Sequence, residues 1–215
     1  MERKFPILRF VLAFFIASAL FALMFLIAYS VAYIDYQQTT YYNRMISSSL
    51  GKMNDLLAAK SCNSSQFIEA SNLLDVVGSR IALLEERLGK KDRSLLELKS
   101  AYTQIQIQHM LLVEKFNDNC NSSFNILLFF YSNSPEKYDA SERTGYVLQA
   151  LKEKHPVQIM IYSFDTDLSY PPIAEFEKRY NITDIPIVVL NNTQKIEVRN
   201  LFEIEPLVIG SSSKN

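Results

Sequence analysis

The sequence is poor in glycine and histidine, and it has no excess of positive charge. Its five glycines are scattered, and none forms the glycine-rich loop that holds nucleotide phosphates. Lysine and arginine together number 22 against 23 acidic residues, so no basic surface exists to neutralise a phosphate backbone. Neither His109 nor His155 has a second ligand at metal-binding spacing, and His109 is expected to be a hydrogen-bonded core residue. The sequence therefore predicts no nucleic-acid partner, no metal and no cofactor.

Charge is missing altogether from residues 10–34, a run of 25 mostly apolar residues. As a helix about 37 Å long, this run can cross a hydrocarbon core of ~30 Å. Three basic residues precede it, which predicts a cytoplasmic N-terminus and a translocated remainder. We expect residues 1–35 to be the cytoplasmic tip and transmembrane anchor of a single-pass protein, held in a lipid bilayer. The alternative is a signal peptide cleaved after Ala32, but the apolar part of a signal peptide usually has about 7–15 residues.

Three segments between the anchor and the second cysteine have the apolar periodicity of helices. The first, over residues 36–60, continues the membrane run in phase, and the other two repeat steps of three and four residues. Gly89 is placed to end the second helix, and Ser94 with Glu97 has the spacing of a capping box that starts the third. Short turns between such helices favour antiparallel neighbours. We expect residues 36–120 to form a stalk, an antiparallel three-helix bundle with coiled-coil-like seams.

The two cysteines and the glycosylation motifs fit an exported chain. Cys62 follows the first stalk helix and Cys120 follows the third, so up-down-up topology places both at one end of the bundle. We expect a structural disulfide, since closing a loop of about 59 residues stabilises by about 4 kcal/mol. The alternative is a redox pair that exchanges with substrates, although the Cys-x-x-Cys spacing is absent. Four Asn-x-Ser/Thr sequons are candidates for glycosylation: Asn63, Asn121, Asn181 and Asn191.

After Cys120 short apolar runs alternate with helical segments. Four strands are predicted, over residues 125–131, 157–162, 187–190 and 195–199. Three helices alternate with them, over residues 140–154, 171–180 and 201–209. This order predicts a small layered α/β domain over residues 121–209, followed by a disordered tail over residues 210–215. The predicted fold class of the whole chain is α+β.

Residues 176–190 join a helix, a short connector, an Ile-Pro pair and a strand. This stretch resembles the thioredoxin superfamily, to which residues 125–208 are similar. In that family the proline that matches Pro186 follows a cis peptide bond beside the active site, where extended peptide is received. The resemblance therefore implies a cis-proline groove made by Ile185, Pro186, Ser132 and Ser134.

The resemblance does not extend to the catalytic cysteines. In the family a Cys-x-x-Cys motif follows the first strand, whereas residues 132–141 contain no cysteine. Thiol–disulfide exchange needs a thiolate nucleophile and a second sulfur, and a serine hydroxyl without an adjacent base cannot replace them. We therefore expect this domain to have no enzymatic activity.

Three functions are compatible with the sequence. The first is a membrane-tethered, extracytoplasmic interaction module that binds a protein or an extended peptide. The second is a thiol–disulfide oxidoreductase or disulfide-assembly factor that uses Cys62 and Cys120. The third is an accessory subunit of a membrane complex, such as the thioredoxin-like accessory subunits of oligosaccharyltransferases. In the last case the fold serves as a packing module, and the groove need not bind peptide.

Overall fold

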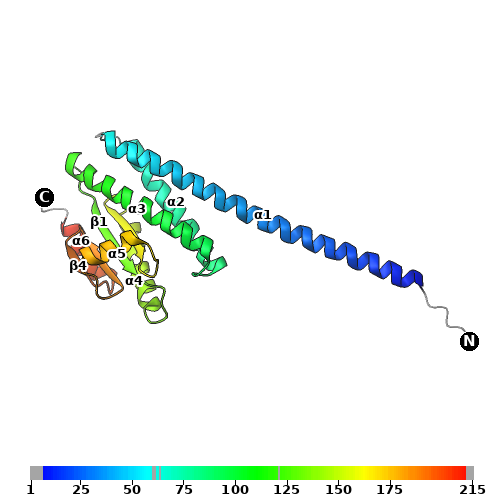
Figure 1. Ribbon diagram of the computed structural model, residues 1–215. Helices are drawn as coiled ribbons and strands as arrows, with labels where there is room; N and C mark the ends of the chain where they lie inside the picture. Colours follow the sequence, from blue (N-terminus) through cyan, green and yellow to red (C-terminus); the bar gives the residue numbers. More distant parts are fainter. Residues whose placement is uncertain (1–6, 60–61, 63, 121, 212–215) are drawn as a thin grey trace, which may run out of the picture. The chain divides into compact units, whose positions relative to one another are not determined.

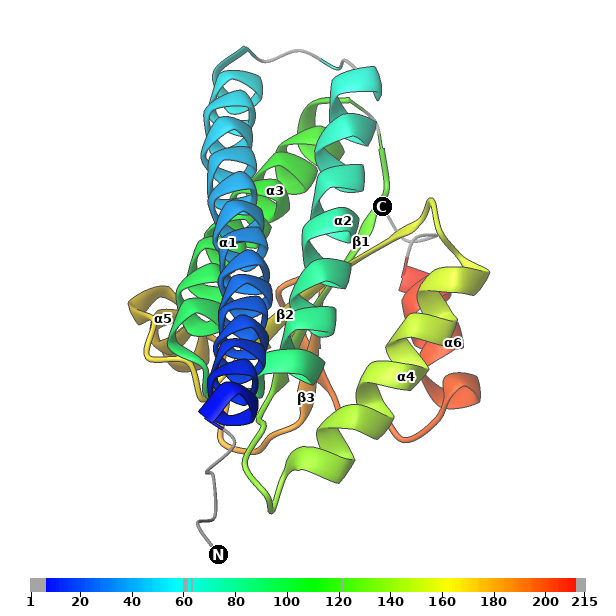
Figure 2. The ribbon, with the colours of Figure 1, turned by 90° about the vertical axis from the view of Figure 1, so that its right-hand side faces the viewer.

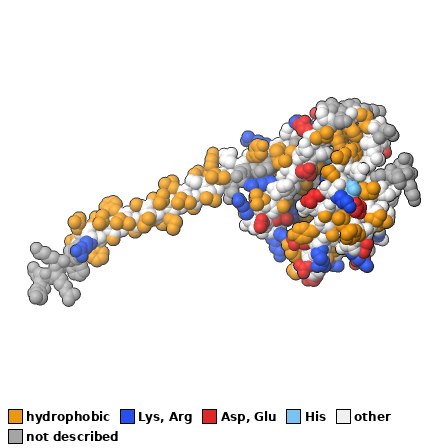
Figure 3. Space-filling model, turned by 180° about the vertical axis from the view of Figure 1, so that it is seen from behind, with side chains coloured by type: hydrophobic (Ala, Val, Ile, Leu, Met, Phe, Trp, Pro, Cys, Tyr) orange, Lys and Arg blue, Asp and Glu red, His pale blue; other side chains and the backbone are white. Residues whose placement is uncertain are grey.

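The structure, a computed structural model, describes residues 7–59, 62, 64–120 and 122–211. The chain divides into two compact units, residues 1–45 and 46–215. The first unit consists of the N-terminal part of helix α1 (Ile7–Ala59). Within it, the 28 residues Ile7–Ile34 form a helix long and apolar enough to cross a membrane. Apolar side chains cover this helix along its length (Figure 3).

The second unit contains helices and a sheet, which confirms the α+β class. After the end of α1 its elements are α2 (Ser64–Leu88), α3 (Arg93–Asn119), β1 (Asn125–Tyr131), α4 (Tyr138–Lys154), β2 (Ile159–Asp165), α5 (Pro171–Arg179), β3 (Ile187–Leu190), β4 (Gln194–Ile196) and α6 (Leu201–Ser211). Figure 1 shows these elements in the colours of the sequence. The strands expected over residues 125–131 and 187–190 have the expected bounds.

Helices α2 and α3 pack against each other in opposite directions. At one end the rings of Phe67 and Phe116 stack with centroids 4.8 Å apart, and at the other end Lys99 reaches Glu85 at 2.7 Å. Gly89 ends α2 with a φ of 82°, the left-handed conformation that glycine adopts without steric cost. The apolar seam predicted for α3 is buried or half-buried at every position.

The start of α3 differs from the capping box that the sequence suggested. The N-cap is Asp92, whose carboxylate accepts the Leu95 N–H at 3.1 Å, and Ser94 donates its hydroxyl to the same group. The hydrogen bond from Ser94, followed by the one from Leu95, lowers the pKa of Asp92. An aspartate two residues earlier provides both an acceptor and a negative charge for the helix N-terminus, so Ser94 becomes its donor instead of the cap.

The bounds of several other elements also differ from the sequence prediction, and α4 begins two residues earlier, at Tyr138. Strand β2 begins two residues later and ends three residues later, because Val157 lies in an exposed turn whereas residues 163–165 pair with β1. Strand β4 ends at Ile196, which is earlier than predicted. Helix α6 continues through Gly210 and Ser211, which the sequence assigned to the tail, and residues 212–215 lie outside the described part.

The four strands form one mixed sheet in the order β2-β1-β3-β4. Strands β1 and β2 are parallel, whereas β3 is antiparallel to both β1 and β4. The β3–β4 turn places Asn191 and Asn192 at φ values of 47° and 60°, as tight hairpins require. Figure 2 shows α4 and α6 on one side of the sheet and α3 and α5 on the other. Residues 46–120 and the sheet thus belong to one compact unit, with α3 serving as a covering helix of the sheet.

Each face of the sheet buries its own apolar core. On the side of α4 and α6, Leu148 and Ile204 pack with Leu127 and Val188. On the other side aromatic rings dominate, and the Phe164 and Phe176 rings meet edge to face with centroids 5.4 Å apart.

Side chains of α3 and α4 bind two backbone groups at the outer edge of β2. Thr166 donates its N–H to the Tyr131 carbonyl of β1. Because N–H groups alternate in direction along a strand, the Ser163 N–H, three residues earlier, points away from β1. The Ser163 N–H donates to Gln106 of α3 at 2.7 Å, and the Ile159 carbonyl accepts from Lys152 of α4 at 2.5 Å. These groups would otherwise be free to pair with another strand.

His109 joins α2, α3 and β2 in a buried hydrogen-bond chain. Its Nδ1 lies 2.8 Å from the Tyr162 hydroxyl, and its Nε2 lies 3.0 Å from the Ser71 hydroxyl. Ser71 can donate in turn to the Phe67 carbonyl at 3.0 Å. A neutral imidazole that accepts from Tyr162 and donates to Ser71 satisfies every member of the chain. His109 is therefore the hydrogen-bonded core residue that the sequence predicted.

Protonation of His109 should destabilise the fold. Burial, with a smaller contribution from the nearby Lys152 charge, lowers the pKa of His109 to about 4. Because the unfolded chain binds this proton at a pH near 6.5, stability should fall by about 3 kcal/mol as the pH is lowered from about 6.5 to about 4. Urea unfolding of the full chain in detergent micelles, followed by the near-UV circular dichroism of its tyrosines, measures this loss. The variant His109→Gln should lack this part of the pH dependence, and an unchanged dependence in the variant would contradict the assignment.

Candidate functional site

The residues of the expected groove lie at the same end of the sheet. Strands β1 and β3 are antiparallel with Phe130 opposite Ile187. Ser132, which follows β1, and Pro186, which precedes β3, therefore lie at the same end. The peptide bond between Ile185 and Pro186 is cis.

The loop after β1 is held by the carboxylate of Asp167. The Ser132 hydroxyl donates to this carboxylate at 2.9 Å and accepts the Ser134 N–H at 3.0 Å. The Asn133 N–H donates to the same carboxylate at 2.6 Å. Ser132 is only 4% exposed, so its hydroxyl is buried and engaged. These hydrogen bonds fix the conformation of the loop. The Ser132 hydroxyl is already engaged in them and is not placed as a nucleophile.

A buried lysine connects this loop to the helices. Lys99 of α3 is 4% exposed, and its ammonium donates to Glu85 of α2 at 2.7 Å and to Asp165 at the end of β2. Asp165 also accepts the side-chain amide of Asn133 at 2.9 Å. Burial alone would lower the pKa of Lys99, but electrostatic interactions with Tyr131 and Asp165 and the two hydrogen bonds raise it above the ordinary lysine value. Lys99 is therefore a permanent cation that joins two helices, the edge strand and the loop.

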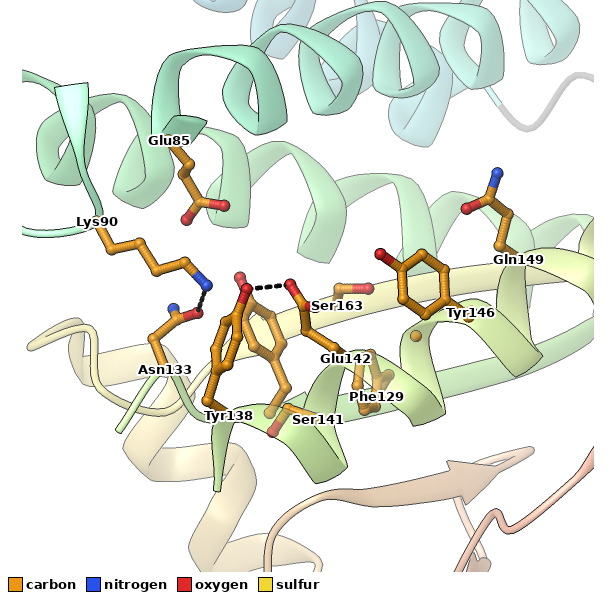
Figure 4. Close-up of a pocket in the computed structure, with 12 residues that line it drawn as sticks. Glu85, Lys90, Phe129, Asn133, Tyr138, Ser141, Glu142, Tyr146, Gln149 and Ser163 are labelled. Carbon is orange, nitrogen blue, oxygen red and sulfur yellow. Dashed lines mark hydrogen bonds between the residues drawn. The ribbon is translucent and has the colours of Figure 1, made fainter. Parts of the chain in front are cut away.

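A pocket of about 350 Å³ opens beside this network (Figure 4). One face of α4 forms a wall, the end of α2 faces it, and residues of β1 and β2 form the floor. The wall presents Tyr138, Glu142 and Tyr146, which follow one another at steps of four residues and so share one helix face. Figure 4 shows the Glu142 carboxylate between the two tyrosines.

Lys90 and Tyr138 occupy one end of the pocket. The Lys90 ammonium lies 3.9 Å from the centroid of the Tyr138 ring, a cation–π contact, and donates to the Asn133 side chain at 2.8 Å. Tyr138 donates its hydroxyl to Glu142. That hydrogen bond, with a smaller effect of burial, raises the pKa of Tyr138 to about 12. Asn133 thus belongs both to the loop after β1 and to the pocket.

The sulfur atoms lie at the opposite end of β1. Cys62 and Cys120 form the predicted disulfide, with their Cα atoms 5.6 Å apart. Cys120 precedes β1 and Ser132 follows it, and a strand of 7 residues spans about 20 Å. The disulfide is therefore remote from the end of the sheet that holds Ser132 and Pro186.

The histidines and acidic groups form no metal centre in the part of the chain that the structure describes. His155 pairs with Glu205 at 2.7 Å, far along the sequence from His109. Lys154 reaches the same carboxylate at 2.7 Å. The hydrogen bonds from Lys154 and then from His155 lower the pKa of Glu205. This cluster ties the end of α4 to α6.

Two of the four glycosylation candidates can be placed. Asn181 is exposed, at a φ of 49°. Asn191 is half-buried, and its side chain accepts the Ile126 N–H at 2.8 Å and donates to Asn125 at 3.0 Å. A glycan on Asn191 would need its amide nitrogen to leave Asn125. Asn63 and Asn121 lie outside the described residues.

Sequence analysis missed the pocket and the lysine network. Glu142 and Tyr146 were a detectable signal, because they lie four residues apart on the helix predicted over residues 140–154. Tyr138 was not, because α4 begins two residues earlier than predicted. No local signal identifies Lys99, since Glu85 and Asp165 are distant in sequence and only the fold brings them to it.

Comparison with known proteins provides no family for this chain. No protein-family model matches the sequence, and no curated protein is similar to it.

Loss of the Lys99 charge should be strongly destabilising. In Lys99→Met the carboxylates of Glu85 and Asp165 stay in a largely buried place without their cation, at an expected cost of about 3–5 kcal/mol. A matched control is Lys52→Met, which breaks the Lys52–Glu69 pair, whose side chains are 66% and 67% exposed. That change should cost less than about 1 kcal/mol. Urea unfolding in detergent micelles measures both, and equal losses would refute the special role of Lys99.

Proposed function

We propose that this protein is a membrane-tethered interaction module that binds a protein partner and performs no redox chemistry. An N-terminal transmembrane anchor with a cytoplasmic tip carries a three-helix stalk and a thioredoxin-like domain outside the cytoplasm. The partner binds at the sheet end formed by Ser132, Ser134, Ile185 and Pro186.

The topology supports the thioredoxin-like part of this proposal. A parallel β1–α4–β2 unit is followed by α5 and by the antiparallel β3–β4 hairpin, with α6 closing the fold. The cis bond at Pro186 lies where the resemblance implied it. Contacts of the last turns of α1 support the stalk: Lys52 pairs with Glu69 of α2 at 2.8 Å, and Lys115 of α3 donates to the Leu57 carbonyl.

The observation that carries the proposal is the separation of the sulfurs from the sheet end. Both cysteines of the chain are joined in a disulfide before β1, whereas the candidate groove follows β1, about 20 Å away. A substrate peptide seated beside Pro186 would have no sulfur within reach. The loop at that end is instead held rigid by Asp167 and by Lys99 through Asp165. A rigid, chemically inert surface suits binding.

Site-specific photo-crosslinking tests the binding surface. The photoreactive residue p-benzoylphenylalanine replaces Asp184, which is exposed beside Ile185, or Asp118, which is exposed near Cys120. Irradiated in the membranes of cells that make the protein, position 184 should give an adduct of defined mass, and position 118 should not. Equal adducts at both positions, or none at 184, would contradict the proposal. Mass spectrometry of the adduct identifies the partner and shows whether it is a membrane-complex subunit.

Insulin reduction tests the absence of redox activity. The full chain in detergent micelles should reduce insulin no faster than the double variant Cys62→Ser with Cys120→Ser, because the disulfide is structural and remote from the groove. Activity of the natural chain that disappears in the double variant would instead favour the oxidoreductase.

A further inference from the structure

We propose that the α4 pocket binds a basic side chain, lysine or arginine, of the protein partner. The inference rests on the proposed function in that the ligand is part of a protein. It concerns a separate surface from the cis-proline end, joined to it by Asn133, which lines the pocket and belongs to the loop after β1.

Aromatic rings are the first argument for a cationic ligand. Tyr131, Tyr138 and Tyr146 all line the pocket, together with Phe129. Tyr146 is 67% exposed, so its ring is open to a ligand. Ring faces are negative and attract an ammonium or a guanidinium, arginine most often. Each tyrosine also carries a hydroxyl, which places a polar group beside the ring face.

The charged residues that line the pocket also favour a cationic ligand. The pocket is lined by two carboxylates, Glu85 and Glu142, and by one cation, Lys90. Glu85 is already paired with Lys99. Glu142 accepts the Tyr138 hydroxyl and forms no ion pair with any residue that the structure describes. Its charge is therefore available to a cation that enters between Tyr138 and Tyr146.

Lys90 shows within the same chain how a cation fits this wall. Its ammonium lies over the Tyr138 ring at 3.9 Å and is held by Asn133. Tyr138 and Asn133 offer Lys90 an aromatic ring and an oxygen acceptor. Tyr146 and Glu142 offer the same two groups to a second cation, further along α4. A volume of about 350 Å³ lies at the lower limit of ligand pockets, which suits one long side chain rather than a larger molecule.

The experiment uses the full chain in detergent micelles, labelled with 3-fluorotyrosine at its 12 tyrosines. The probes are N-acetyl-arginine and N-acetyl-lysine methylamides, with the uncharged citrulline and norleucine analogues as matched controls. Fluorine resonances of Tyr138 and Tyr146 are assigned with Tyr→Phe variants. We expect saturable shifts with a Kd of about 1–10 mM for the charged probes. Binding of the uncharged analogues should be at least about fivefold weaker.

The variant Glu142→Gln removes the available charge without touching the Lys99 network, and it should weaken the charged probes by about fivefold. The matched control Glu175→Gln, an exposed glutamate on α5, should leave binding unchanged. The inference is overturned by equal shifts from charged and uncharged probes, by their absence, or by Glu142→Gln binding as the natural chain does. Photo-crosslinking at position 184 is an independent measurement, so this pocket can fail while the proposed binding surface stands.

Discussion

The second unit depends on the buried ion pairs that Lys99 forms with Glu85 and Asp165. Charges are rarely buried without partners, and here one lysine satisfies Glu85 of α2 and Asp165 of β2 at once. Through Asp165 and Asn133 the same charge reaches the loop after β1. Because each carboxylate would be costly to bury alone, the helices, the edge strand and the loop must assemble together. The candidate binding surface thus takes its shape from a residue that no ligand needs to contact.

Helix α3 gives the molecule its particular architecture. It packs against α2, and its other side covers the aromatic face of the sheet. Gln106 and His109 carry polar contacts across that junction to Ser163 and Tyr162. Residues 46–215, which lie on both sides of the predicted domain boundary at residue 120, form one compact unit. We expect this unit to unfold as one cooperative body.

The features that could be predicted from the sequence are those that depend on apolar periodicity and on local residue chemistry. The helical repeats of α2 and α3, the apolar strands β1 and β3, the glycine that ends α2 and the disulfide were all accessible, because each depends on neighbours or on chain topology. The end of β2 was not, since Ser163 and Asp165 are polar and their strand is stabilised by side chains from α3. The pocket was missed for a related reason. The Glu142 and Tyr146 part of its α4 face was visible as a pattern, but only the fold brings Lys90 and Glu85 to it.

The side chains that bind backbone groups at the edge of β2 have a consequence for proteins that lie in one membrane plane. Chains tethered as we propose would meet one another far more often than in free solution, always with the same parts at the same height. A sheet with an open border would then extend from copy to copy into a filament. Gln106 and Lys152 occupy one border, and the other ends in a strand of only 3 residues. In chains tethered in this way, such borders would keep each copy a separate body even at high surface density.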